Sequence, residues 1–245
     1  MMVHFHSSHN CVNGARVIDE GPAHGRVDVI PEHRQIVNQR SGANQSVFRL
    51  GSLNVGTLRG HAGEVVETLT RRNVDVCCLQ EVRWRGASAR MITGKDSQYK
   101  MFWVGNSTGL GGVGLLVARK WIDLVIDVKR VNDRLMMIKL LIGKRVVAIV
   151  STYAPQQGLG EDEKDKFYED LITLVSNIDE DNLVIIGGDL NGHVGKDIGG
   201  YEGVHGGFGY GTRNTEGERI LEMGLALDMV VCNTFIKKRE SRLIT

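Results

Sequence analysis

Short apolar runs alternate with segments of helical periodicity from residue 48 onward. The short runs predict buried strands, because a strand covered on both faces is apolar throughout. They cover residues 48–54, 74–80, 112–118, 135–142, 145–153, 183–186 and 229–235. Apolar side chains three and four residues apart predict helices over 64–72 and 161–178, and a third helix from Thr215. This alternation predicts an α/β fold.

Turn and cap signals set three boundaries. Gly143-Lys144 separates two of the apolar runs and predicts a hairpin. Residues 192–217 are rich in glycine and are expected to form a long loop. Thr215 and Glu218 have the spacing of a capping box, in which each side chain bonds the backbone N–H of the other residue. The third helix is therefore expected to begin with Thr215 as its cap.

The first part of the chain lacks this pattern. Residues 1–47 hold five of the eight histidines, and Pro22 and Pro31 interrupt them. We expect a poorly ordered leader there. The remaining residues, 48–245, are enough for one large α/β domain with a sizeable core.

Composition indicates the cellular compartment of the protein more clearly than its function. The 30 lysines and arginines nearly balance the 29 acidic residues, so attraction to nucleic acid must come from a local patch. The cysteines, at positions 11, 77, 78 and 232, match no metal-site spacing and suit a reducing compartment. No apolar run reaches the ~20 residues of a membrane span, and the start has no secretory pattern. We expect an intracellular protein without a membrane partner.

Polar side chains follow several predicted strands: Asn54, Glu81, Tyr153, and Asp189 with Asn191. In open α/β sheets, ligands bind beyond strand ends, where side chains converge without burial of unpaired polar groups. Glu81 is a hard oxygen ligand of the kind that Mg²⁺ takes, and carboxylates, amides and a phenol around a metal suit phosphoryl chemistry. Each piece alone is more often a solvated strand end, a turn or a loop. Their order and shared position favour a site.

Four segments occur in this order: Ser-Leu-Asn-Val-Gly-Thr-Leu (52–58), Leu-Gln-Glu-Val-Arg (79–83), Ser-Thr-Tyr-Ala-Pro (151–155) and Gly-Gly-Asp-Leu-Asn-Gly (187–192). They resemble four successive motifs of the endonuclease/exonuclease/phosphatase family. The resemblance runs from about residue 48 to the end and is closest to the endonuclease domains of RTE-type non-LTR retrotransposons. It implies a four-layered α/β-sandwich, in which helices flank two packed mixed sheets.

The resemblance also assigns roles. Glu81 would be the principal metal-binding residue, and Asn54 would lie beside the metal. Tyr153 would lie near the scissile phosphate. Asp189 would orient or activate the attacking water, and Asn191 would stabilise the transition state. The implied cofactor is Mg²⁺, with Mn²⁺ as an alternative.

Three further residues are candidate contacts to substrate phosphate. Gln156 follows the Tyr-Ala-Pro segment, and Arg83 and Arg85 follow the Glu81 motif. A solvated basic loop explains the two arginines equally well.

The family has two later motifs, an aspartate on a late strand and a terminal Ser-Asp-His-type segment. The sequence ends at Thr245 before either, so the resemblance implies a domain that is incomplete at its C-terminus, with its last strands missing. His61, His193 and His205 are not expected to replace the absent histidine, because loop histidines are mostly solvated. We therefore expect metal binding with little or no turnover.

These observations leave three functional hypotheses. The leading one is a Mg²⁺-dependent DNA endonuclease of retrotransposon origin that acts in the nucleus. The alternative is a non-catalytic remnant that binds nucleic acid or a protein through the inherited surface. The third keeps the chemistry but takes a phosphoinositide or sphingomyelin, and the fold cannot choose among them.

Overall fold

The computed structural model describes residues 2–5, 28–29 and 48–237. Its strands are β1 (Met2–Phe5), β2 (Asp28–Val29), β3 (Leu50–Asn54), β4 (Val76–Gln80), β5 (Gly86–Thr93), β6 (Gln98–Gly105), β7 (Val113–Ala118), β8 (Val125–Asn132), β9 (Leu135–Ile142), β10 (Arg145–Tyr153), β11 (Leu183–Asp189) and β12 (Met229–Val231). The α-helices are α1 (Ala62–Arg71), α2 (Glu161–Ser176) and α3 (Thr215–Ala226), and the 3-10 helices are η1 (Arg119–Leu124) and η2 (Cys232–Phe235).

The described strands form two mixed sheets. The strand order is β12-β1-β11-β10-β9-β8 in one sheet and β2-β3-β4-β7-β6-β5 in the other. Each sheet contains a central parallel pair. Tyr153 of β10 lies opposite Asp189 of β11, and Asn54 of β3 lies opposite Gln80 of β4. Because parallel neighbours end at the same edge, the residues that follow each pair gather at one end of their sheet.

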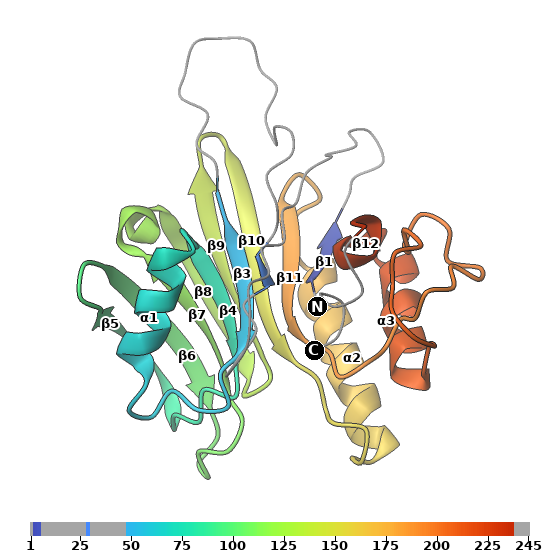
Figure 1. Cartoon of the computed structure of the whole chain (residues 1–245), viewed down its shortest axis with the longest axis horizontal. Coiled ribbons are helices and arrows are strands. Elements are labelled where there is room, and N and C mark those ends of the chain that lie inside the picture. Colours follow the sequence, from blue (N-terminus) through green and yellow to red (C-terminus); the bar gives the residue numbers. More distant parts are fainter. Residues whose placement is uncertain (1, 6–27, 30–47, 238–245) are drawn as a thin grey trace.

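The two sheets pack face to face between two layers of helix. Helix α1 lies against the β3-β4 sheet, and α2 and α3 lie against the β10-β11 sheet (Figure 1). At the centre the sheets touch directly, since Ser151 Oγ of β10 donates to Leu79 O of β4 at 3.2 Å. Gly187 permits this approach, because a Cβ there would lie 2.9 Å from Cys78 Sγ. The expected four-layered α/β-sandwich is confirmed.

Most predicted elements are confirmed, including the hairpin of β9 and β10 and all three α-helices. Strands β5, β6 and β8 were missed. Seven of the eight positions of β5 are exposed, and β8 is exposed or half-buried throughout, so neither has an apolar run to reveal it. These strands exist because they pair with better-buried neighbours, which is information that a local pattern does not contain.

Two boundary predictions are wrong. Residues 229–235 were expected to form one strand, but the strand ends at Val231 and η2 follows. The cap of α3 is Asn214, whose side-chain oxygen accepts from Gly217 N at 2.8 Å, so Thr215 is the first helical residue and not the cap. Asn214 has extended backbone, with φ of −113°, which is the conformation that aims a capping side chain at the first turn.

Two short strands lie within the expected leader, residues 1–47. Strand β1 pairs with both β11 and β12, and β2 pairs with β3. The other residues of this stretch lie outside the described residues, as do residues 238–245. The division of the chain at residue 48 therefore stays a prediction. Among the helices that the structure describes, none has both the length and the apolar character that crossing a membrane requires.

Candidate active site

Two carboxylates meet at one amide group. Asn54, at the end of β3, donates from Nδ2 to Glu81 Oε1 at 3.0 Å and to Asp189 Oδ2 at 3.2 Å. Glu81 follows β4 of the same sheet, whereas Asp189 ends β11 of the other sheet. The Asn54 amide thus bridges an acid of one sheet and an acid of the other. The two acids therefore surround one polar centre that both sheets build.

Glu81 receives two further hydrogen bonds. Tyr153 OH donates to Oε1 at 3.0 Å, and Arg83 Nη2 donates to Oε2 at 2.7 Å. Partial burial acts to raise the pKa of Glu81. The hydrogen bonds from Asn54, Arg83 and Tyr153, with the charge of Arg83, outweigh burial and hold that pKa below its ordinary value. Glu81 is therefore a carboxylate at neutral pH.

Tyr153 is held as a neutral donor. Burial is the main reason that its pKa is raised, and the negative charge of Glu81 adds to the effect. Gln156, in the loop after β10, donates from Nε2 to Tyr153 OH at 3.4 Å. The phenol thus keeps its proton at neutral pH and presents it to Glu81 Oε1.

A second set of bonds joins the loops after β10 and β11. Asp189 Oδ1 accepts from Asn191 N at 3.2 Å, and Asn191 Nδ2 donates to Ala154 O at 2.8 Å. Ala154 N in turn donates to Asp189 O at 2.9 Å. These bonds fix the Asp189 carboxylate relative to Tyr153, which precedes Ala154 in the chain.

Three residues of this group have left-handed backbone. The φ angle is 56° at Glu81, 52° at Arg83 and 49° at Asn191. Such a conformation costs roughly 1–2 kcal/mol for a residue with a Cβ, and strain of this kind clusters at functional sites. At the Glu81 turn it is maintained by a bond from Arg83 N to Gly111 O at 2.8 Å.

Seven of the eight candidate residues thus belong to one hydrogen-bonded group: Asn54, Glu81, Arg83, Tyr153, Gln156, Asp189 and Asn191. The eighth, Arg85, lies outside it. In the described part of the chain its exposed side chain makes no hydrogen bond to the others, although its carbonyl accepts from Trp103 Nε1 at 3.3 Å. Arg83 contacts Glu81 here, so its role as a phosphate contact stays a prediction.

The family model for the endonuclease/exonuclease/phosphatase family matches residues 51–243. The chain belongs to this family. Craniofacial development protein 2 of Bos taurus is 27% identical over 199 residues, which cover 81% of this chain and 33% of that protein. The same protein of Tragulus javanicus is 26% identical over 199 residues, which cover 81% of this chain and 34% of that protein. The chain spans about a third of the length of these curated relatives.

Solved structures of the family share the fold. The catalytic domain of Xenopus laevis APE2 has a TM-score of 0.51 at 15% identity, with 71% of this chain and 67% of that chain covered. The endonuclease domain of TRAS1, a telomere-specific non-LTR retrotransposon, has a TM-score of 0.49 at 14% identity, with coverage of 74% and 72%. At such identities the APE2 comparison supports the architecture of two mixed sheets and no finer property.

Enzymes of the endonuclease/exonuclease/phosphatase family typically depend on a divalent metal ion. Among residues 48–237, as in the two described strands before them, no group of three or more His, Cys, Asp or Glu side chains is arranged to hold one. Mg²⁺ does not require such a group, because one or two carboxylates commonly bind it while water and substrate phosphate complete its octahedron. Glu81 and Asp189, joined through Asn54, supply two carboxylates. The donor set fits Mg²⁺, with Glu81 as the residue that would hold it.

The orientation of Asn54 bears on its predicted role. Its Oδ1 accepts from Gly56 N at 3.0 Å, while its Nδ2 faces the two acids. The reverse assignment would place the amide oxygen against two carboxylates, so the network fixes the orientation. Asn54 therefore acts here as a donor between Glu81 and Asp189, and direct ligation of a metal by its oxygen stays a prediction.

Sequence reasoning missed two arginines beside the group. Arg59 donates from Nε to Arg83 O at 2.8 Å and from Nη2 to Gly109 O at 3.3 Å. Arg134, between β8 and β9, places its guanidinium 5.6 Å from the centre of the Tyr153 ring and donates to Tyr153 O at 3.4 Å. Arg59 is the residue after the Asn54 motif and could have been included with it. Arg134 could not have been found from the sequence, because only the pairing of β9 with β10 brings it next to Tyr153.

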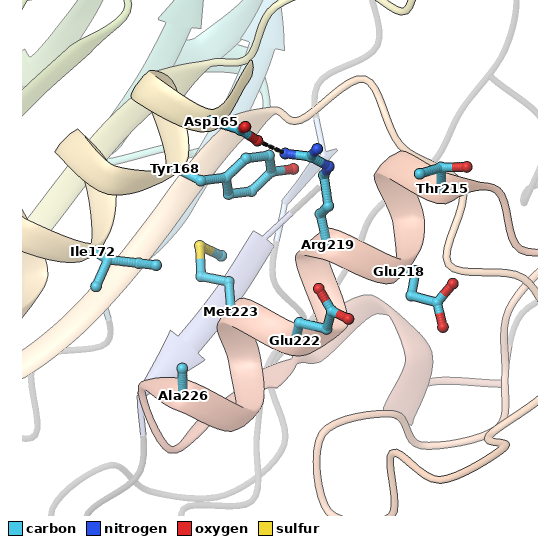
Figure 2. Close-up of a pocket in the computed structure, with 9 residues that line it drawn as sticks. All are labelled: Asp165, Tyr168, Ile172, Thr215, Glu218, Arg219, Glu222, Met223 and Ala226. Carbon is cyan, nitrogen blue, oxygen red and sulfur yellow. Dashed lines mark hydrogen bonds and ion pairs between the residues drawn. The ribbon is translucent and has the colours of Figure 1, made fainter. Parts of the chain in front are cut away.

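A buried ion pair joins α2 to α3, and the loop after β10 bonds to its acid. Lys164 of α2 and Glu216 of α3 are 5% and 7% exposed, and Lys164 Nζ lies 2.9 Å from Glu216 Oε1. Gln157, next to the candidate Gln156, donates to Glu216 Oε2 at 3.2 Å. Figure 2 shows Arg219 of α3 paired with Asp165 of α2 at a pocket between the helices, and none of the eight candidates lines that pocket.

The loop histidines do not join the group. His205 was expected to be solvated, which is wrong, since it is 2% exposed. Its Nε2 lies 3.1 Å from Gly195 O, and its Nδ1 accepts from Gly207 N at 3.0 Å. Burial is the main reason that its pKa is lowered, so His205 is neutral and structural at neutral pH. His193 is exposed, as expected, and lies beside Asn214.

Proposed function

We propose that this chain is a divalent-metal-dependent phosphodiester hydrolase that nicks DNA. The observation that carries the proposal is the meeting of Glu81 and Asp189 at the Asn54 amide, with Tyr153 OH on the same Glu81 oxygen. Two carboxylates, an amide and a protonated phenol in one place can hold a cation, orient a water and contact a phosphate.

Each residue has a part in this proposal. Mg²⁺, or Mn²⁺ in its place, would supply charge that stabilises the phosphate in the transition state. Glu81 would hold the ion. Asp189, fixed by its bond from Asn191 N, accepts from the attacking water and orients it. Tyr153 and Asn191 donate to the phosphate oxygens, and Gln156 supports the Tyr153 hydroxyl.

DNA is the proposed substrate for two reasons. The sequence motifs resemble those of retrotransposon endonuclease domains, so we propose that origin for the chain. Arg83 and Arg85 follow Glu81 directly and give the site a cationic border, which suits a polyanion. A DNA substrate in turn makes the nucleus the expected place of action.

A plasmid-nicking assay tests the proposal. The full chain is incubated with supercoiled plasmid and Mg²⁺, with a chelator as the metal control. We expect slow nicking, since the sequence predicts little turnover, and Glu81→Gln and Asp189→Asn should each lower its rate at least a hundredfold, because each removes a charge on which the chemistry depends. Glu180→Gln is the matched control, since Glu180 is exposed and precedes β11, at the opposite end of that strand from Asp189. Metal-independent nicking, or equal rates in all variants, would refute the proposal.

One observation favours a non-catalytic alternative. Arg83 occupies Glu81 Oε2 at 2.7 Å, so one of the oxygens that would hold the metal is already bound. A protein that kept the surface but lost the metal would bind nucleic acid without cutting it. Retardation of DNA that weakens with salt, in the presence of Mg²⁺ and without nicking, would support this alternative.

A further inference from the structure

The segment that leads away from Glu81 carries only positive charge. Residues 82–95 contain Arg83, Arg85, Arg90 and Lys95 and no aspartate or glutamate. The chain as a whole has a net charge of only +1, so this is a local excess. In the structure the segment forms the turn after β4 and then β5, which is the edge strand of its sheet. A cationic edge beside a candidate phosphodiesterase site suits a polyanionic ligand.

Two tryptophans lie among these cations. The Trp84 and Trp103 rings are 4.9 Å apart and nearly perpendicular. The Arg90 guanidinium lies over the Trp84 ring, 4.1 Å from its centre. Arg90 is exposed, so the side of the guanidinium away from the indole faces solvent. Bases stack on arginine planes and on aromatic rings, and arginine N–H groups bind phosphate.

The strand pairing places these residues on one surface. Ser88 of β5 lies opposite Trp103 of β6, and Arg90 lies opposite Met101, so Trp103 and Arg90 share a face of the hairpin. Arg130 of β8 reinforces the hairpin, since it donates to Trp103 O at 3.1 Å and to Ser88 O at 3.0 Å. The surface is therefore preformed rather than a flexible tail.

This surface is continuous with the candidate site. Trp84 follows Arg83, whose guanidinium holds Glu81 and whose carbonyl accepts from Arg59. The exposed arginines 59 and 85 both approach Gly109, because a Cβ there would lie 2.4 Å from Arg59 Nη2 and 3.2 Å from Arg85 Cγ. A strand bound along Trp84 would thus pass these arginines on its way to the two acids.

We propose that Trp84, Arg85, Arg90 and Trp103, named here the Trp84 surface, bind one DNA strand on one side of the cleavage position. Arg85 and Arg90 contact successive phosphates, and a base stacks on the Arg90–Trp84 pair. The proposal rests on the proposed function for its ligand. It adds the path of the substrate and predicts a preference for DNA with unpaired bases next to the site, because stacking on this surface needs a base outside the duplex.

Binding measured without catalysis tests this surface. Anisotropy of a labelled 12-nucleotide single strand, and of the same sequence as duplex, is followed in chelator over a range of salt concentrations. For the parent chain we expect tighter binding of the single strand. The double variant Arg85→Gln/Arg90→Gln should bind the single strand at least tenfold more weakly. The slope of its log affinity against log salt concentration should fall by the amount that about one to two phosphate contacts contribute. Both residues are exposed, so the variant should fold.

Lys144→Gln/Arg145→Gln is the matched control. This control removes the same charge from the exposed β9–β10 turn, which lies at the other end of β10 from Tyr153. It should bind DNA with an affinity within twofold of the parent. Stacking has its own readout: bases quench tryptophan fluorescence, and Trp84→Phe should lose most of that quenching while Trp121→Phe keeps it. Trp121 packs against Phe48 in the core.

The outcomes separate the two proposals. The proposal of the Trp84 surface is overturned if DNA binding weakens equally in the double variant and in its control. It is also overturned if both variants bind DNA as tightly as the parent. Capture of polyglutamate or anionic vesicles with no affinity for DNA also overturns it. Absence of Mg²⁺-dependent nicking with the expected binding pattern intact refutes the proposed hydrolysis and leaves the surface standing.

Discussion

Replacement of Asn54 by aspartate tests the centre of the candidate site. In the parent chain one amide nitrogen donates to both Glu81 and Asp189. Asn54→Asp keeps the shape of the side chain, removes both donated bonds and adds a third carboxylate. We therefore expect a large loss of stability in the absence of metal, from a substitution that changes hardly any volume.

The magnitude follows from those two contacts. A hydrogen bond to a charged group contributes about 1.5–3 kcal/mol, and the lower end applies because Asn54 is only partly buried, so two lost bonds amount to about 3 kcal/mol. Repulsion among the three carboxylates destabilises the variant further, by about 1.4 kcal/mol for each unit by which the pKa of the new carboxyl rises. This loss is smaller than the full repulsion, because the new carboxyl can hold a proton. The folded variant then binds more protons than the unfolded chain, so its deficit should grow as pH rises.

Urea unfolding, with and without divalent metal, provides the measurement. With a slope of about 2–3 kcal/mol per molar urea, the variant should unfold at roughly 1 M less urea than the parent in chelator. Mg²⁺ at a hundred times its Kd adds about 2.7 kcal/mol to the chain that binds it, and it should narrow the gap because the third carboxylate lets the variant bind the ion more tightly than the parent. Asn182→Asp is the control, because Asn182 makes one exposed bond to Asp179 and should change stability by less than about 0.5 kcal/mol. A variant as stable as this control in chelator would refute the central position of Asn54.

Three further predictions address the surroundings of this centre. Tyr153→Phe removes the 3.0 Å bond to the charged Glu81 and should lower the free energy of unfolding by about 1.5 kcal/mol in a urea titration. Because the pKa of Glu81 is lowered in the folded state, its contribution to stability is present above the ordinary carboxyl pKa and lost as pH falls through the lowered value. Glu81→Gln should therefore flatten the loss of stability on acidification below the ordinary carboxyl pKa. Lys164→Met leaves buried Glu216 without its cation and should lower Tm, whereas Lys166→Met, at an exposed position on the same helix, should leave Tm unchanged in a calorimetric scan.

The buried strands and the polar residues at their ends were predictable from the sequence. Strands such as β4, β10 and β11 are apolar because both faces are covered, and such a run is visible locally. The residues that interrupt these runs, Glu81 and Asp189 among them, stand out for the same reason. Physical chemistry explains why they gather, since parallel strands end at a common edge, and the family resemblance supplied their roles.

Partners across the sheets were not predictable in the same way. Arg83 was a candidate contact to substrate phosphate, which stays a prediction, and the structure pairs its guanidinium with Glu81, two residues earlier. Arg134 lies over Tyr153 only through the register of β9 and β10. Lys164 and Glu216 come from separate helices whose contact no periodicity reveals. Each of these contacts depends on tertiary geometry, which a local pattern does not encode.

The candidate site is therefore a consequence of strand register as much as of residue identity. Tyr153 lies opposite Asp189, and Asn54 lies opposite Gln80, the residue before Glu81. Side chains alternate between the two faces of a strand, so a slip of one residue in β10 would turn Tyr153 away from Glu81. The buried bond from Ser151 Oγ to Leu79 O opposes that slip, because it joins β10 to β4 two residues before each strand delivers its site residue. The contact that packs the two sheets together thus also aligns the groups proposed to act on the phosphate.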